Sequence, residues 1–309
     1  MPSAVTAVRP AYRPYVVTVA GVQPLSPHFS RVTVTHDDLA HFGTAGLDQR
    51  IKILFPHEDG SFADVGQHEA AGDWYDRWRA LPDAARNPLR TYTVRRIDPE
   101  ARELDIDFVV HHGAGPAGAW ALRAAVGDEI IVVGPDQRGP DPRIGLDWRP
   151  GTARRVLLAG DETAAPAICA VLETLGDAYD VDAFIEVPTA ADTQRTSVPH
   201  SFRVRWLARD DAPHGARLVD AVTAWTHRSP DLLRRAAAPR PQVLEDIDVD
   251  RDLLWDSSTS GDGEFYAWLA GESATIKSLR RLLVGGCGVD RRRVAFMGYW
   301  RRGQAERTG

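Results

Sequence analysis

Short runs in which apolar and polar residues alternate, separated by glycine and proline, fill the first half of the chain. This pattern is typical of antiparallel strands joined by turns. A helix is expected near residues 73–81, where Trp74, Trp78 and Leu81 recur at helical spacing. The expected strands, about six in number, cover residues 15–19, 30–35, 50–55, 91–96, 103–110 and 129–133. Short strands of this kind predict a small antiparallel β-barrel.

From Arg155 onward, short apolar strands alternate with amphipathic helices. The expected strands cover residues 156–159, 183–187, 203–207, 265–270 and 293–299, and the expected helices cover residues 164–175, 216–225 and 274–284. Such alternation indicates a parallel sheet with right-handed crossovers, which binds ligands at the carboxyl ends of its strands. We therefore expect a two-domain β + α/β protein.

The boundary between the two domains is expected within residues 134–151, which are rich in glycine, proline, aspartate and arginine. Residues 1–150 would form the antiparallel barrel domain, and residues 151–309 would form a Rossmann-like parallel α/β domain. Each segment is of ordinary domain length.

Composition narrows the class of protein. The chain of 309 residues is 43% apolar and 26% charged, as globular proteins are, and its net charge of -6 argues against nucleic-acid binding. Cys169 and Cys287 form neither a disulfide framework nor a cysteine-rich metal site, and neither His111 nor His112 has metal-ligand spacing to a carboxylate or cysteine. No signal peptide and no apolar run of ~18 residues is visible. We expect no metal, no membrane insertion and a cytoplasmic location.

The stretch at residues 90–95 reads Arg-Thr-Tyr-Thr-Val-Arg. On a strand, we expect Arg90, Tyr92 and Thr93 to share one face. Arginine recognises phosphate as a planar bidentate donor, the tyrosine ring can lie against another flat ring, and the threonine adds a hydroxyl. These groups suit a bound flavin dinucleotide. The alternative is an edge strand whose arginine and threonine face water.

A second informative stretch, residues 107–120, runs from an apolar strand into a loop of small residues, and a short helix is expected to open near Gly118. Small residues let backbone N–H groups approach a phosphate, and a helix N-terminus favours negative charge. A diphosphate would fit between this loop and Arg90. The alternative is an ordinary Gly-Pro loop before a helix.

The turn after the first strand of the second half reads Gly-Asp-Glu-Thr-Ala-Ala-Pro, residues 160–166. It lacks the GxGxxG pattern of a dinucleotide loop, and its two carboxylates, Asp161 and Glu162, disfavour phosphate. Capping of the following helix is the alternative role for both side chains.

Five motifs together resemble the siderophore-interacting protein family, which belongs to the ferredoxin-reductase-like flavoproteins. They are R-T-Y-T-V-R at 90–95, D-F-V-V-H…G-P-A-G-A-W at 107–120, G-D-E-T-A-A-P-A at 160–167, W-L-A-G-E-S-A at 268–274 and G-Y-W-R-R-G at 298–303. The resemblance covers nearly the whole chain in order. It implies an FAD-binding Greek-key barrel, an NAD(P)H-binding α/β domain, and a reductase that converts ferric siderophore to the ferrous form and releases the iron.

The resemblance also assigns residues. Arg90 would bind a flavin phosphate, Tyr92 would pack on the isoalloxazine or ribityl, and Thr93 would hydrogen-bond near the reactive flavin nitrogen, which makes Thr93 the candidate catalytic residue. The cofactor-binding residues implied are Arg90, Thr91, Tyr92, Thr93, Asp107, Val109, His111, Gly115, Pro116, Ala117, Trp120, Asp161 and Thr163. The chain departs from the family pattern at His112-Gly113, where relatives often have glycine followed by a polar residue.

The implied substrate is a ferric siderophore, and the iron belongs to that substrate. Catecholate siderophores are anionic, so we expect basic residues near the flavin, with Lys52, Arg123 and Arg301 as candidates. The electron donor stays open between NADH, NADPH and a reduced ferredoxin. Two other classes of function also stay open: a flavoprotein reductase that serves a partner oxygenase, and a siderophore-binding module without enzymatic activity.

Overall fold

The structure is a computed structural model that describes residues 9–110, 115–141, 143–244, 254–257 and 263–303. The chain divides into two compact units. The first comprises Met1–Pro24 and Phe29–Leu146, and the second comprises Leu25–His28 and Asp147–Arg307. Among the described residues, no helix combines the length and the apolar character that crossing a membrane requires.

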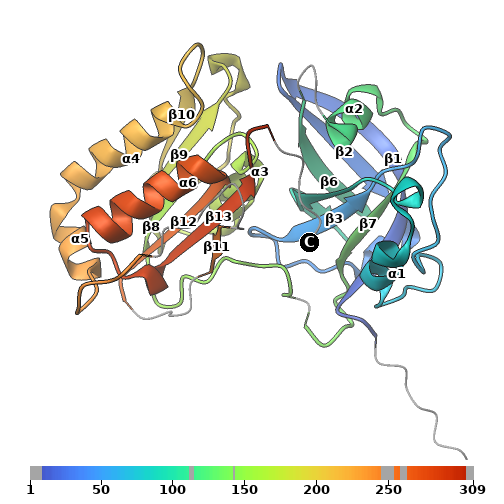
Figure 1. The fold of residues 1–309 in the computed structure, drawn as a ribbon, viewed down its shortest axis with the longest axis horizontal. Helices are drawn as coiled ribbons and strands as arrows, with labels where there is room; N and C mark the ends of the chain where they lie inside the picture. Colours follow the sequence, from blue (N-terminus) through green and yellow to red (C-terminus); the bar gives the residue numbers. More distant parts are fainter. Residues whose placement is uncertain (1–8, 111–114, 142, 245–253, 258–262, 304–309) are drawn as a thin grey trace, which may run out of the picture. The chain divides into compact units, whose positions relative to one another are not determined.

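The first unit is built on a seven-stranded antiparallel sheet that curls into a half-barrel (Figure 1). Its strands are β1 (Tyr12–Ser26), β2 (Phe29–Thr35), β3 (Arg50–Leu54), β4 (Leu89–Thr93), β5 (Arg96–Asp98), β6 (Glu103–Val109) and β7 (Glu129–Pro135). They are ordered β4-β3-β7-β1-β2-β6-β5. The predicted antiparallel β architecture is confirmed.

The strand expected over residues 91–96 is two strands in the structure. The backbone N–H of Val94 still bonds to the Gln49 carbonyl beside β3, at 2.9 Å, whereas the N–H of Arg95 bonds to the Asp105 carbonyl of β6, at 3.0 Å. The chain thus changes partner strand between adjacent residues. An unbroken apolar-polar pattern does not reveal such a change.

Alternation along the strands separates an inner from an outer face of the half-barrel. The inner face forms an apolar core with Val32, Ile53 and Ile106 among its fully buried members. On the outer face, helix α1 (Trp74–Ala80) buries Trp74 and Trp78 in a second cluster. The helix predicted near residues 73–81 is therefore confirmed. Helix α2 (Pro116–Arg123) packs on β2 and β6 and adds its buried residues to the inner core.

The second unit contains a six-stranded sheet ordered β10-β9-β8-β12-β13-β11. Its strands are β8 (Arg155–Gly160), β9 (Asp180–Val187), β10 (Arg203–Ala208), β11 (Trp255–Asp256), β12 (Phe265–Glu272) and β13 (Val294–Trp300). All neighbours pair in parallel except β11, which pairs antiparallel with β13 at the edge. The predicted parallel α/β sheet is confirmed.

Helices cover both faces of this sheet (Figure 1). On one face lie α4 (Ala216–Arg228), α5 (Pro230–Ala236) and α6 (Ser273–Arg280), which share an apolar core with the strands. Helix α3 (Ala165–Thr174) lies on the other face against β8. At Gly160 a Cβ atom would stand 2.5 Å from the Ala164 Cβ and 2.6 Å from the Ala270 carbonyl oxygen, so the close approach of α3 requires glycine there.

The remaining helical segments are short. They are η1 (Asp37–His41), η2 (Asp83–Ala85), η3 (Ala190–Asp192), the π-helical turn η4 (Arg281–Gly286) and η5 (Arg291–Arg293). The helix expected over residues 274–284 is thus α6 followed by η4.

Candidate functional site

Strand β4 places the flavin-directed residues on two faces, and one expectation about them is wrong. Arg90 and Tyr92 lie opposite Ile53 and Ile51 on the inner face. Thr93 belongs to the opposite face, because adjacent strand residues point to opposite sides of a sheet. The hydroxyl of Thr93 therefore cannot share a face with Arg90 and Tyr92, although Thr93 itself is buried.

Arg90 retains donors for an anion. Its Nη1 donates to the carbonyl of Leu89 at 2.8 Å, and the guanidinium forms no ion pair within the described part of the chain. The residue is half-buried. A partly buried guanidinium without a carboxylate partner fits a bound phosphate.

Tyr92 belongs to an aromatic cluster that joins β4 to α2. Its ring centroid lies 4.5 Å from that of Phe108 and 6.3 Å from that of Phe55. The Trp120 ring of α2 contacts the same two phenylalanines, at 5.6 Å and 5.4 Å. Tyr92 is half-buried, whereas Phe55, Phe108 and Trp120 are buried, so the cluster holds the tyrosine ring at its margin.

Helix α2 begins with small residues. Gly115 is the N-cap, Pro116 is in the first turn, and Ala117 is buried against the barrel. Among the described residues, no heavy atom lies within 4 Å of the position that a Cβ atom of Gly115 would occupy. His111 lies outside the described residues. A helix N-terminus with small residues suits a phosphate group.

These observations test the fit to FAD. An arginine without a carboxylate partner among the described residues, a half-buried tyrosine packed on an aromatic cluster, and a helix N-terminus of small residues all belong to the first unit. They match the diphosphate and the flat ring of a flavin dinucleotide. The described residues of this unit therefore fit the cofactor.

Asp107 and Val109 lie on the outer face of β6. The Asp107 carboxylate, fully buried, receives Nε and Nη2 of Arg31 at 2.7 and 2.9 Å, and Arg95 Nε lies 3.5 Å away. A carboxylate held by two arginines is engaged within the protein. Any effect of Asp107 on a cofactor would therefore act through the position of Arg31 and Arg95.

The three candidate substrate residues occupy separate elements. Lys52 of β3 is half-buried, and its Nζ donates to Oγ1 of Thr91 at 2.5 Å on the outer face of the first sheet. Arg123 is exposed at the last turn of α2. Arg301 belongs to the second unit, where it is half-buried just after β13.

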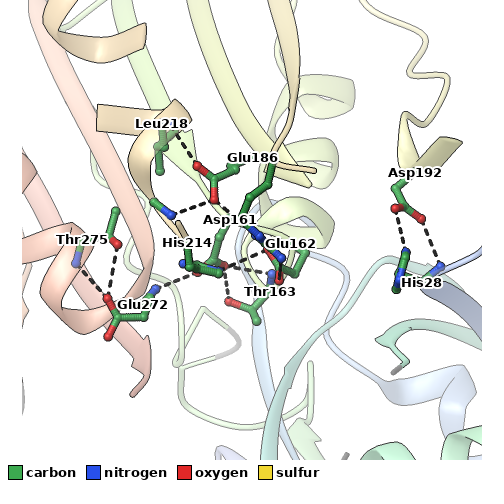
Figure 2. A network of polar contacts seen from close by, with 12 residues as sticks. His28, Asp161, Glu162, Thr163, Glu186, Asp192, His214, Leu218, Glu272 and Thr275 are labelled. Atoms are coloured by element: carbon green, nitrogen blue, oxygen red, sulfur yellow. Dashed lines mark hydrogen bonds and ion pairs between the residues drawn. The ribbon is translucent and has the colours of Figure 1, made fainter. Parts of the chain in front are cut away.

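At the carboxyl ends of strands in the second unit, carboxylates gather around a histidine (Figure 2). Asp161 follows β8 and is almost fully buried. Its Oδ1 accepts hydrogen bonds from the backbone N–H and the hydroxyl of Thr163, at 2.9 and 2.6 Å. Its Oδ2 accepts from the Glu272 N–H at 2.7 Å and from Trp300 Nε1 at 2.8 Å. One carboxylate thereby joins the ends of β8, β12 and β13.

Arg209 links two more carboxylates. Its Nη1 and Nη2 each donate to Glu162 at 3.0 Å, and Nη1 also donates to Glu186 at 3.2 Å. Glu186 is fully buried in β9, and its carboxylate accepts the N–H groups of Gly215 and Leu218 at 2.7 and 3.0 Å. This carboxylate therefore caps the N-terminus of α4.

His214 lies beside this pair of acids. Its Nε2 is 3.5 Å from Glu162 Oε2 and 3.7 Å from Asp161 Oδ2, and its ring meets the Trp300 ring edge-on at 5.0 Å. Burial disfavours the imidazolium, but Glu162 and Asp161 outweigh it and raise the pKa of His214. The ring is therefore more readily protonated than a histidine in water.

The pKa values of Asp161 and Glu162 shift in opposite directions. Burial raises the pKa of Asp161, and the neighbouring Glu162 charge raises it further. Burial also opposes ionisation of Glu162, yet His214 and Arg209 lower the pKa of Glu162 to about 2. Because the contact with His214 is 3.5 Å and the Arg209 contacts are 3.0 Å, we regard Arg209 as the stronger partner.

Asp161, Glu162 and His214 offer ligand atoms within 4.8 Å of one another, a spacing that a metal ion can bridge. The hydrogen-bond donors that already hold Asp161 and Glu162 argue against a metal ion at this position. Four hydrogen bonds occupy the lone pairs of Asp161, and a bidentate guanidinium holds Glu162. The capping alternative holds for Asp161, whose carboxylate accepts the N–H of Thr163 and whose carbonyl accepts the N–H groups of Ala164 and Ala165 where α3 begins. Glu162 is instead engaged by Arg209.

Sequence reasoning identified Asp161 and Thr163 but missed Arg209, Glu186 and His214. Trp300 and Glu272 lay inside two of the quoted motifs, so those motifs could have pointed to them. Nothing in the local sequence around residues 186, 209 and 214 indicates that three different segments meet.

Comparisons with known proteins cover both units. Residues 18–139 match a family described as the siderophore-interacting FAD-binding domain, and residues 153–303 match the family siderophore-interacting protein. The ferric vibriobactin reductase ViuB of Vibrio cholerae is 30% identical over 283 residues, which are 91% of this chain and 87% of that protein. The NADPH-dependent ferric-chelate reductase of Escherichia coli is 27% identical over 287 residues, with 92% and 91% covered.

A solved structure is also similar to this chain over most of its length. The siderophore-interacting protein SipS from Aeromonas hydrophila superposes with a TM-score of 0.66 at 28% sequence identity. The match covers 96% of this chain and 94% of SipS. The likeness therefore extends over both units rather than over one of them.

Proposed function

The chain belongs to the siderophore-interacting protein family, and from this premise we propose that it is a flavin-dependent reductase of ferric siderophores. The substrate is a chelate of Fe(III), and the product is Fe(II). Hard oxygen ligands hold Fe(II) much more weakly than Fe(III), so reduction alone frees the metal. The reaction needs no acid–base pair from the protein.

One observation in the first unit carries the proposal. Arg90 has no carboxylate partner among the described residues, and the aromatic cluster joins its strand to α2, which begins with small residues. Arg90 and the α2 N-terminus would hold the diphosphate of FAD. Tyr92 would lie along the flavin, and Thr93, on the other face of β4, would act close to the reactive edge. Bound FAD supplies the exchange between two-electron and one-electron chemistry.

The electron donor is a reduced nicotinamide. A similar protein from Escherichia coli is named an NADPH-dependent reductase, and the parallel sheet of the second unit offers its carboxyl end to a ligand. Asp161 and Glu162 make the end of β8 unfavourable for a pyrophosphate. The phosphates of the donor would therefore bind away from these two acids.

Lys52, Arg123 and Arg301 would attract an anionic siderophore. The chain as a whole has a net charge of -6, so an anionic chelate needs a local region of positive potential. Lys52 has a fixed position, because its Nζ is bonded to Thr91. It is the first of the three to test.

The function is tested on purified protein under anaerobic conditions. We expect a visible flavin spectrum that bleaches on addition of NADPH or NADH and recovers when a ferric catecholate is added, with Fe(II) captured by a ferrous chelator. Reduced ferredoxin serves as a third donor. A protein without flavin, or a reduced flavin that ferric siderophore fails to reoxidise, would refute the proposal. Reoxidation only by an oxygenase partner would favour the electron-transfer alternative.

A further inference from the structure

A pocket in the second unit lies at the opposite end of the sheet from Asp161. Arg155 begins β8, Asp180 begins β9 and Arg203 begins β10, and all three line the pocket. The last turn of α4 forms its wall with Trp225 and Arg228. The cavity has a volume of about 410 Å³. It is therefore separate from the carboxyl end of the sheet, where a nicotinamide is proposed to bind.

Two carboxylates and two arginines form the floor of the pocket. Asp180 and Asp182 are both bridged by Arg155 and by Arg203. Arg203 holds Asp182 with Nε and Nη2 at 2.7 and 3.2 Å, and Trp225 Nε1 donates to the same carboxylate at 2.9 Å. These charges balance one another, and the contacts fix the geometry of the floor.

Two further arginines, Arg205 and Arg228, line the pocket. Arg205 lies with its guanidinium carbon 5.9 Å from the centroid of the Phe184 ring, and Arg228 stands in the last turn of α4. Neither forms an ion pair with a carboxylate within the described residues. The lining thus contains four arginines against two aspartates, an excess of two positive charges in one concave site.

We propose that this pocket binds a small polyanion carrying two phosphate or carboxylate groups, one held by Arg205 and one by Arg228. Guanidinium groups bind both kinds of oxyanion through paired N–H donors. A concave, partly apolar wall that includes Phe184 and Trp225 strengthens such contacts relative to a flat surface. The inference does not depend on the reductase activity.

The test measures binding to the whole protein by titration calorimetry at low ionic strength. Inorganic pyrophosphate and citrate are the two probes, and the tighter one identifies phosphate or carboxylate as the preferred group. The double variant Arg205→Gln/Arg228→Gln should lose at least about tenfold in affinity, since each charge-assisted contact has about that effect. Raising the salt concentration should weaken binding to the natural protein.

A matched control removes the same charge elsewhere. Arg217→Gln/Arg234→Gln takes two exposed arginines from α4 and α5 that do not line the pocket. It should bind the probe as the natural protein does. Binding of neither probe, an unchanged affinity in the pocket variant, or an equal loss in the control would each overturn the proposal. Circular dichroism of each variant confirms that the fold is intact before the titration.

Discussion

Replacing Arg209 with methionine should destabilise the second unit strongly. The guanidinium is the bidentate partner of Glu162 and also contacts Glu186, and the side chains of these residues are 15%, 10% and 0% exposed. Methionine keeps much of the side-chain volume but leaves Glu186 without a cation and Glu162 with His214 as its remaining partner. Removal of one partner from a buried pair costs roughly 3–5 kcal/mol.

The pKa of Glu162 gives an upper bound on this effect. His214 and Arg209 together lower it from 4.5 to about 2, which corresponds to roughly 3 kcal/mol of stability shared between the two partners when the carboxylate is ionised. Because the folded-state pKa is depressed, this stability is present above pH 4.5 and is lost as the pH falls toward about 2. The difference between the natural protein and Arg209→Met should therefore shrink with acidification.

Hydrogen exchange followed by mass spectrometry measures the effect, since a chain with two units need not unfold in a single step. Peptides from β9 and α4 should exchange faster in Arg209→Met at neutral pH. The control Arg234→Met removes a surface arginine that is 74% exposed and paired with Asp231, so its cost should stay below about 1 kcal/mol. Equal costs for the two variants, or a difference that persists unchanged down to about pH 3, would refute the reasoning.

Four further outcomes follow from the site. Arg90→Ala should reduce the affinity for FAD roughly ten- to a hundredfold, measured by flavin release, because one charge-assisted phosphate contact is lost. Thr93→Val should retain FAD within about 1 kcal/mol of binding energy and change the rate of flavin reduction instead. Equal loss of FAD in the Arg90→Ala and Thr93→Val variants would contradict the roles assigned to the two residues. Lys52→Ala should raise KM for an anionic ferric catecholate far more than for a neutral ferric hydroxamate, and the catecholate kcat/KM should fall as the salt concentration rises. Equal effects on both substrates would show that Lys52 has no role in binding the substrate. His214→Gln should reduce stability below pH 6.5, where the raised pKa of the natural histidine contributes fully to stability. The difference in stability between the natural protein and the variant should vanish as the pH rises past that pKa. A difference that is independent of pH would contradict the ionic role of His214.

Periodicity was sufficient for most of the elements and for the fold class, an antiparallel β part and a parallel α/β part, but it gave no sign of β11 or α5. It failed where the fold changes partners or brings distant segments together. The sequence pattern did not predict that the strand ends after Thr93, because Val94 and Arg95 differ only in the segment whose carbonyl accepts their N–H groups. The error about the face of Thr93 had a simpler cause, since a motif was interpreted as a unit while a strand alternates at every residue.

Only some residues of the site around Asp161 could be predicted from the sequence. Asp161 and Thr163 lie in a turn that follows a recognisable strand, so their position could be predicted. Arg209 and His214 come from the connection between β10 and α4, and their charge pairs form only when that connection folds over β8 and β9. Burial decides their importance, and burial of a loop residue has no periodic signal.

The capping of α4 by Glu186 has a consequence for protein engineering. The acceptor for the first N–H groups of the helix is a side chain of β9, about thirty residues earlier, and not a residue of the helix itself. A chimera that exchanged α4 alone would transplant a helix without its acceptor and would leave the host strand with a buried, half-satisfied carboxylate. The smallest segment that can be exchanged between related proteins without this mismatch therefore runs from β9 through α4.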